Sequence, residues 1–164
     1  MSQDQTRDFD KLVSDKIEKG VANVTLYLES KKIVDEEIIR LADMEVLAEV
    51  THLELGENQI SDKGVSALCS SPFTKKLKVL NLKSNAIAET GAQLIAQAEN
   101  LGQLEQLILK FNKIGEQGAQ YLADSQTLVN LTTLDLFRNR IGDIGAKAIK
   151  SSKNFRRVSR LRLD

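Results

Sequence analysis

Residues 104–122 read LEQLILKFNKIGEQGAQYL, and 27 positions later residues 131–149 read LTTLDLFRNRIGDIGAKAI. The two segments share leucine, asparagine, isoleucine and glycine at matching positions, and self-similarity at a fixed period of this length is typical of solenoids built from stacked repeats. The same unit recurs along the rest of the chain without insertion or deletion. Its anchor leucines, spaced 27 residues apart, are Leu26, Leu53, Leu80, Leu107, Leu134 and Leu161.

Each unit has two halves with different periodicity. A second leucine follows each anchor after two positions, and apolar and polar residues alternate around this pair, which predicts a short strand with one buried face. In the second half, Gly64, Gly91, Gly118 and Gly145 precede small and apolar residues at a spacing that suits a helix packed closely against the strand. Each unit is therefore predicted to be one strand followed by one helix.

Stacking such units places parallel strands on the inner curve and the wider helices outside. The predicted fold is an α/β solenoid over residues 21–164, with about five repeats plus a final strand, a parallel sheet on the concave face and helices on the convex face. Asn58, Asn85, Asn112 and Asn139 each follow an anchor by five positions. Because buried polar groups are normally hydrogen-bonded, we expect these amides to satisfy backbone groups where the chain leaves each strand, and not to serve catalysis.

The unit L-x-x-L-x-L-x-x-N-x-I resembles that of the ribonuclease-inhibitor-type leucine-rich-repeat proteins, and the resemblance covers roughly residues 21–164. That family includes enzyme inhibitors, GTPase-activating proteins, innate immune receptors and effector proteins of intracellular bacteria. What the resemblance implies in common is protein binding. The uniform spacing looks more like the simpler bacterial, effector-like version than the alternating, cysteine-rich repeats of mammalian ribonuclease inhibitors.

Solenoids need polar caps over their terminal repeats. Residues 1–20 are predicted to provide one as a capping helix from about Thr6 to Lys19, which Gly20 would end. Its apolar side comprises Phe9, Leu12, Val13 and Ile17. A membrane-anchoring helix is the alternative, and the acidic residues on its polar face argue against it. At the other end the chain stops after the strand of a sixth repeat, so a fragment and a natural edge strand protected by charge both stay open.

Composition restricts the environment and the partners. The 23 basic and 23 acidic side chains cancel, so no overall field favours nucleic acid or an anionic membrane. The single cysteine, Cys69, cannot close an intramolecular disulfide, which indicates a reducing compartment. The sequence has neither an apolar signal-peptide core nor a run of roughly 18 apolar residues. We therefore expect a cytoplasmic protein with no membrane partner, although delivery into a host cell by a dedicated bacterial apparatus would leave the same signature.

The variable strand positions between the fixed leucines point off the concave sheet, so packing does not dictate their residue types. We predict partner-binding residues at these positions and just after the strands. They are Tyr27, Glu54, Asn81, Lys83, Ile108, Lys110, Phe111, Asp135, Phe137 and Arg138. Ile108, Phe111, Phe137 and Arg138 should form one patch across neighbouring repeats, because exposed aromatics beside an arginine are common interface anchors. The alternative is that both phenyl rings fold back over the rim and only cover backbone.

Charge changes sign along the chain. Residues 1–60 carry 7 basic and 14 acidic side chains, whereas residues 111–164 carry 10 basic and 5 acidic ones. Such a gradient would orient a partner with the opposite gradient and speed encounter. Variation of charge on solvated helix surfaces, without functional meaning, is the alternative.

Catalytic constellations are not indicated. His52, the only histidine, is predicted on the concave strand face and Cys69 on a convex helix, so the two cannot form a nucleophile–base pair or a closed zinc site. The glycines of GEQG and GDIG recur at the repeat period and lack the Gly-Lys-Ser/Thr ending of a phosphate loop. We predict no enzyme activity, catalytic residue, cofactor, metal or small-molecule substrate.

The predicted function is to hold a folded protein partner against the concave face and thereby inhibit or scaffold an enzyme. The enzymatic alternative is regulation of a small GTPase, as in the GTPase-activating branch of the family, although the chain is short for that branch. Nucleic-acid binding is a weaker alternative, because few aromatics are interleaved with the basic residues. It would use Arg138, Arg140, Arg156, Arg157, Arg160 and Arg162.

Overall fold

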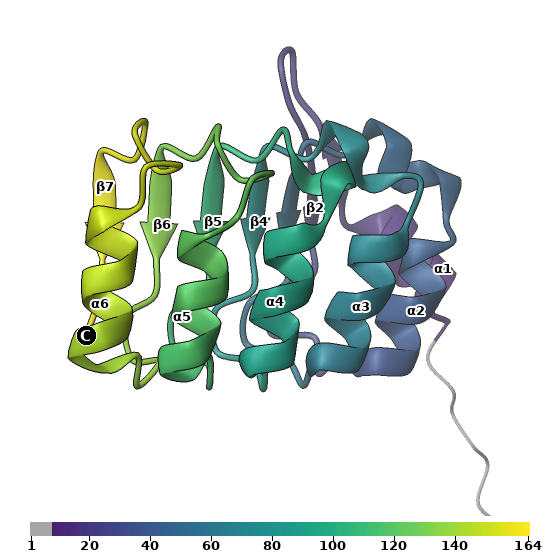
Figure 1. Cartoon of the computed structure of the whole chain (residues 1–164). Helices are drawn as coiled ribbons and strands as arrows, with labels where there is room; N and C mark the ends of the chain where they lie inside the picture. Colours follow the sequence, from purple (N-terminus) through teal and green to yellow (C-terminus); the bar gives the residue numbers. More distant parts are fainter. Residues whose placement is uncertain (1–7) are drawn as a thin grey trace, which may run out of the picture.

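The computed structural model describes residues 8–164, which form one sheet backed by a row of helices (Figure 1). Along the described residues the sheet has seven strands in chain order: β1 (Ile17–Lys19), β2 (Val24–Tyr27), β3 (His52–Glu54), β4 (Val79–Asn81), β5 (Gln106–Ile108), β6 (Thr133–Asp135) and β7 (Arg160–Arg162). Strands β2 to β7 are parallel, and anchor leucines such as Leu53 and Leu80 are direct register partners. The predicted α/β solenoid is confirmed.

The helices cover the convex side of the sheet, so the opposite, concave face is left open (Figure 1). After each strand from β2 to β6 comes one helix: α2 (Asp35–Ala42), α3 (Asp62–Ser70), α4 (Glu89–Gln97), α5 (Gly115–Ala123) or α6 (Gly142–Ser151). Three short 3-10 helices follow α2, α3 and α4: η1 (Glu45–Glu49), η2 (Thr74–Lys76) and η3 (Glu99–Leu101). The core lies between the sheet and the helices. The strand leucines from Leu26 to Leu136 are fully buried in it, whereas Leu161 in the last strand is partly exposed. Burial of each such side chain stabilises the fold by about 1.5–3 kcal/mol.

The asparagine ladder links consecutive repeats through the backbone. Asn112 donates from its Nδ2 to the carbonyl oxygens of Leu82 (2.9 Å) and Leu109 (2.8 Å), and its Oδ1 accepts from the amide of Ile87 (3.0 Å). Asn58, Asn85 and Asn139 make the equivalent bonds one or two repeats away. The predicted structural role of these amides is confirmed.

A second periodic ladder runs along the other edge of the repeats, and the sequence reasoning missed it. Ser71 donates from its hydroxyl to the carbonyl oxygen of Ala42 at 2.6 Å, and Ser125 makes the same bond to Ala96 at 2.6 Å. Each serine thus satisfies a carbonyl at the end of the preceding helix, where no intrahelical partner exists. Ala98 stands where the repeat in between would have this serine. There the side-chain amide of Asn100 donates instead to the carbonyl oxygens of Leu68 and Ser71.

The N-terminal cap is shorter than predicted and contains a strand. The helix α1 covers Phe9–Asp15, begins at the N-cap Asp8 and buries Phe9 and Val13 in the core; the predicted start at Thr6 lies outside the described residues. The helical prediction for residues 16–19 is wrong, because Ile17–Lys19 pairs antiparallel with β2. This pairing satisfies backbone groups that the first parallel strand would otherwise expose at the sheet edge.

The turn between β1 and β2 also differs from the prediction. Gly20 does not end a helix but donates its amide to the carbonyl oxygen of Asn23 (2.8 Å) within this turn. The hairpin of β1 and β2 rises beyond the rest of the sheet (Figure 1), with Val21 fully exposed near its tip.

Gly64 of α3 and Gly91 of α4 each lie against an aspartate of the preceding helix, and this packing predicts a stability effect. Asp62 accepts a hydrogen bond from the amide of Ala88 (2.7 Å) at the start of α4, and a Cβ added at Gly91 would overlap the Asp62 carboxylate and approach Ile87 Cγ2 to 2.6 Å. We expect Gly91→Ala to displace this cap and lower the free energy of unfolding by about 1–3 kcal/mol in urea titrations. Thr90→Ala, at an exposed position of the same helix, is the control, and equal stability of the two variants would contradict the packing role.

Candidate functional site

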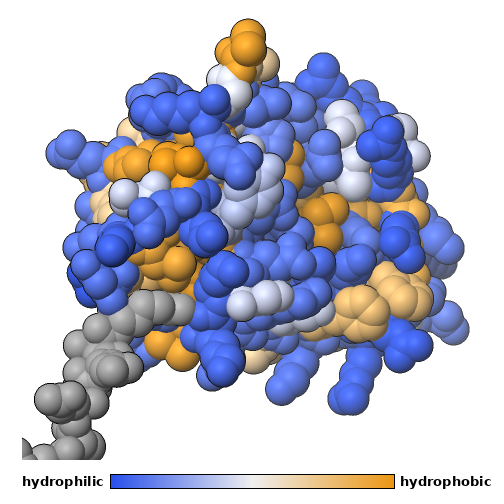
Figure 2. Space-filling model, turned by 180° about the vertical axis from the view of Figure 1, so that it is seen from behind, coloured by the Kyte–Doolittle hydropathy of each residue, from blue (hydrophilic) through white to orange (hydrophobic). Residues whose placement is uncertain are grey.

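The concave face presents one row of side chains across the sheet. Tyr27, Glu54, Asn81, Ile108 and Asp135, all predicted partner-binding residues, are successive register partners at the ends of β2 to β6. Figure 2 shows this side of the molecule as mostly hydrophilic, with separate hydrophobic patches. Asp135 differs from the others because it is only 5% exposed. Its Oδ1 accepts the amide of Phe137 (3.1 Å) and its Oδ2 lies 3.7 Å from the Arg162 guanidinium, so it supports neighbouring residues more than it faces solvent.

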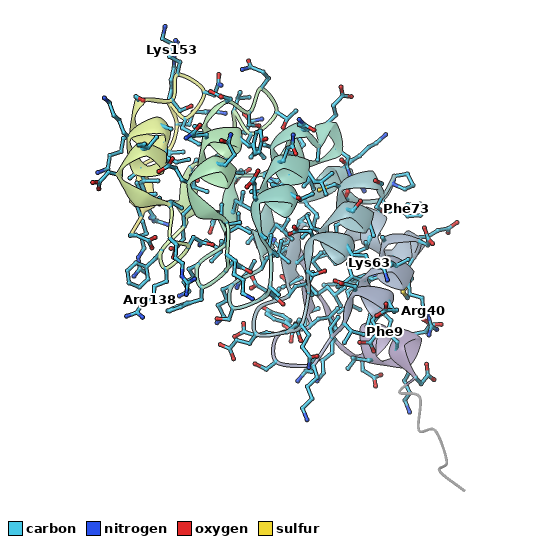
Figure 3. All side chains as sticks on the ribbon, turned by 60° about the horizontal axis from the view of Figure 1, so that its bottom comes forward. Phe9, Arg40, Lys63, Phe73, Arg138 and Lys153 are labelled. Carbon is cyan, nitrogen blue, oxygen red and sulfur yellow. The ribbon has the colours of Figure 1, made fainter. Side chains whose placement is uncertain are left out.

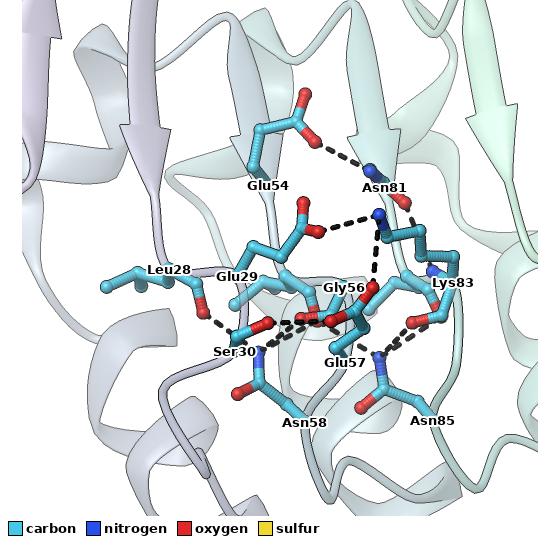
Figure 4. Close-up of polar contacts among 12 residues, drawn as sticks. Leu28, Glu29, Ser30, Glu54, Gly56, Glu57, Asn58, Asn81, Lys83 and Asn85 are labelled. Carbon is cyan, nitrogen blue, oxygen red and sulfur yellow. Dashed lines mark hydrogen bonds and ion pairs between the residues drawn. The ribbon is translucent and has the colours of Figure 1, made fainter.

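In the N-terminal half of this face one lysine is paired with acidic side chains, which are in excess there (Figure 4). The ammonium of Lys83 lies 2.6 Å from Glu29 Oε1 and 3.4 Å from Glu57 Oε1, so one lysine bridges three repeats. Gly56 lies under the stem of Lys83, and a Cβ there would come within 2.8 Å of it. The absence of a side chain at residue 56 therefore lets Lys83 lie across the middle repeat.

The other polar residues of this half are engaged as well. Asn81 donates from its Nδ2 to Glu54 Oε2 (2.7 Å) and accepts the amide of Lys83 (3.1 Å) at its Oδ1. Three predicted site residues, Glu54, Asn81 and Lys83, are thus occupied by intramolecular bonds.

This network predicts a measurable titration. The Ser30 hydroxyl, which donates to Glu57 Oε2 at 2.8 Å, and next the Lys83 ammonium hold the pKa of Glu57 below its ordinary value of 4.5. Because the folded pKa is depressed, the stabilisation from Glu57 is fully present above pH 4.5 and is lost as the pH falls through the folded pKa. We expect Lys83→Met to raise the pKa of Glu57 in an NMR titration and Lys113→Met to leave it unchanged. An unaltered pKa in Lys83→Met would contradict the ion pair.

Three positions after each residue of the row from Tyr27 to Asp135, the backbone is left-handed. The φ angles range from 52° to 59° at Ser30, Glu57, Ser84, Phe111 and Arg138. This conformation costs roughly 1–2 kcal/mol for residues with a Cβ, and bulky residues rarely adopt it. The turn into the asparagine ladder imposes the backbone, whereas the side chain is free to vary, since serine serves as well as phenylalanine.

The C-terminal half of the face carries an aromatic–cationic cluster, formed by Lys110, Phe111, Phe137, Arg138 and Arg162. The two rings meet edge to face, with their centroids 5.9 Å apart and an interplanar angle of 82°. The Arg138 guanidinium lies 5.9 Å from the Phe111 centroid and 5.6 Å from the Phe137 centroid. Lys110 lies 6.0 Å from the Phe111 centroid and Arg162 5.5 Å from that of Phe137, distances at which cation–π attraction operates.

Beside the cluster lies an open depression of about 670 Å³. Its lining residues are Phe111, Asn112, Lys113, Phe137, Arg138, Arg140 and Asp164. Phe111 stays 43% exposed, whereas Phe137 is half-buried. Figure 3 shows Arg138 projecting away from the ribbon, on the opposite side of the C-terminal repeats from Lys153.

The structure therefore brings together only part of the predicted site. Phe111, Phe137 and Arg138 meet, with Lys110 beside them, whereas Tyr27 lies three strands away from Ile108 across the sheet. The sequence reasoning did not include Lys113, Arg140, Arg162 and Asp164 in the protein-binding site. A usable signal was present for two of them, because Lys113 and Arg140 each directly follow a ladder asparagine.

The nucleophile and base candidates lie on different elements. His52, on β3, has its Nδ1 2.9 Å from the Thr51 hydroxyl, and Cys69, on α3, packs against the core. Burial raises the pKa of the Cys69 thiol to about 12. We expect Cys69 in the folded protein to react with a disulfide reagent at pH 8 at least about a hundredfold more slowly than in denaturant, because the thiolate is the reacting species. Equal rates, measured by thiolate release, would contradict this burial.

Within residues 8–164, no three histidine, cysteine, aspartate or glutamate side chains are grouped so that they could hold a metal ion. Among the helices of the same range, none combines the length and the apolar character needed to cross a membrane.

Comparisons with known proteins agree with this architecture. A leucine-rich-repeat family model matches residues 50–69, 75–96, 104–123 and 127–150, more than half of the chain. The crystal structure of an internalin from Listeria monocytogenes is similar, with 28% sequence identity and a TM-score of 0.53 over 85% of this chain, which spans 40% of the internalin chain. A search of curated proteins gives no match. The chain belongs to the leucine-rich-repeat family, whose members generally mediate protein–protein interaction.

Proposed function

We propose that the chain holds a folded protein partner on its concave face, centred on the aromatic–cationic cluster. The observation that carries the proposal is the pair of phenyl rings at the end of the sheet, one of them 43% exposed. A few aromatic and arginine side chains usually supply most of the energy of a protein interface. The fold itself does not require phenylalanine at residue 111, since Ser30 and Ser84 occupy the same left-handed position.

We further propose that binding inhibits or scaffolds the partner, and that the chain itself is not an enzyme. The separation of His52 from Cys69 and the raised pKa of the Cys69 thiol support this reading. The ribonuclease-inhibitor-type, effector-like classification and the cytoplasmic location belong to the same proposal. The strand–helix repeat supports the classification, and the free cysteine supports the cytoplasmic location.

Site-specific photo-crosslinking tests the proposed function. A photoreactive amino acid at Ile108, on the concave face, should give a discrete protein adduct in lysate of the source organism or of a host cell. The same residue at Ile144, which is 59% exposed on α6, should not give that adduct. An adduct formed only from residue 144 would place the interaction on the convex side and overturn the proposal.

A further inference from the structure

Cations in the two halves of the concave face differ in whether they are paired. Lys83 has two carboxylate partners, whereas Lys110, at the equivalent position one repeat later, has no carboxylate within ion-pair distance among residues 8–164. The same holds in this range for Lys113, Arg138 and Arg140, which line the depression. Lys113, Arg138 and Arg140 thus face a single acidic lining residue, Asp164, so positive charge is in excess where the two phenyl rings lie.

Two carboxylates of the C-terminal repeats, Asp135 and Asp164, are engaged with other partners. Asp135 is buried; its carboxylate accepts the amide of Phe137 and lies beside the Arg162 guanidinium. Asp164 accepts the amide of Asn139 at its Oδ1 and the amide of Ile141 at its Oδ2, both at 3.1 Å. Each carboxylate thus satisfies backbone amides, and the guanidinium groups of Arg138 and Arg140 keep their hydrogen-bonding capacity for a ligand.

We propose that this depression binds an acidic, extended segment of a partner protein, in which carboxylates flank an apolar side chain. Two arginines offer planar donors that match carboxylates in bidentate geometry. Phe111 and Phe137 provide an apolar wall for the side chain between those carboxylates. The proposal rests on the proposed function and names the chemistry of its partner.

The charge pattern favours an acidic peptide over a nucleic acid. A polyanion that continued along the concave face would meet Glu29, Glu54 and Glu57 in the N-terminal half, where like charges repel it. Guanidinium groups already lie within 6 Å of both ring centroids, in positions that compete with stacked bases. A segment with a short acidic stretch satisfies both constraints.

Fluorescence anisotropy with defined probes tests the inference on the full chain. The probe is a labelled dodecapeptide with glutamates flanking one central leucine. Arg138→Gln combined with Arg140→Gln should weaken its binding at least about tenfold, because two charge-assisted contacts are lost. Lys147→Gln combined with Lys150→Gln, which removes the same charge from α6 on the convex side, should change affinity less than twofold.

Further probes and variants distinguish specific binding of the acidic peptide from charge attraction alone, and test it independently of the proposed function. A peptide with lysines in place of the glutamates should not bind, and Phe111→Ala should weaken the acidic peptide. Tighter, ring-dependent binding of a thymidine dodecamer would overturn the inference in favour of nucleic acid, and equal binding by the two charge variants would also overturn it. If the arginine variant kept full crosslinking to its protein partner from residue 108, the inference would fall while the proposed function stood.

Discussion

Replacing both Phe111 and Phe137 by alanine is expected to weaken binding of the protein partner by at least about 2 kcal/mol, which is roughly thirtyfold in Kd. The physical reason is that the two rings pack edge to face and share Arg138, so their removal eliminates the apolar surface and the cation–π contacts of the cluster. Surface plasmon resonance with the purified chain and the purified partner identified by crosslinking measures the change in Kd.

The control for this variant is Ile144→Ala, which trims an exposed apolar side chain from the convex helix α6. It should leave the affinity within twofold. Thermal unfolding of the double variant should stay close to that of the wild type, because Phe111 is exposed and Phe137 only half-buried. Affinity that is unchanged in the folded double variant would remove the cluster from the binding site.

Asn112→Ala is expected to cause the largest loss of stability among these substitutions, about 3 kcal/mol or more. It leaves the buried amide of Ile87 without its partner, at a cost of about 1–3 kcal/mol. It also removes one hydrogen bond from each of the carbonyl oxygens of Leu82 and Leu109, at about 0.5–1.5 kcal/mol per bond, although these oxygens keep the bonds from Asn85 and Asn139. Urea unfolding followed by circular dichroism measures the loss.

Asn81→Ala is the matched control, because Asn81 lies half-buried on the concave face and bonds to Glu54. We expect it to cost at most about 1 kcal/mol. Similar losses in the two variants would mean that the ladder contributes no more than a surface hydrogen bond.

Much of the fold could be predicted from the sequence because packing ties residue type to position. Leu53 and Leu80 are register partners as their 27-residue spacing requires, and the ladder amides are fixed by the need to satisfy backbone groups. The strand β1 was missed because Ile17 continues the helical pattern of Phe9 and Val13, while the demand for an edge partner arises only in the assembled sheet. The serine ladder was missed although Ser125 and Ser152 repeat at the same period.

The candidate site was less predictable than the fold. Which side chains meet after the strand depends on the left-handed turn at Phe111 and Arg138, a backbone state that neither residue type indicates. The pairing of Lys83 with Glu29 depends on Gly56, which lies against the stem of Lys83 in space but a whole repeat away in sequence. Residue type alone therefore gave Lys83 and Lys110 the same expected role, whereas only Lys83 is neutralised.

Hydrogen–deuterium exchange of the chain with and without its crosslinked partner locates the binding surface. The partner is expected to slow exchange in β5, β6 and the turns that follow them, at residues 106–113 and 133–140, and to leave α5 and α6 unchanged. Protection confined to the convex helices, with these turns unaffected, would contradict binding at the concave C-terminal repeats.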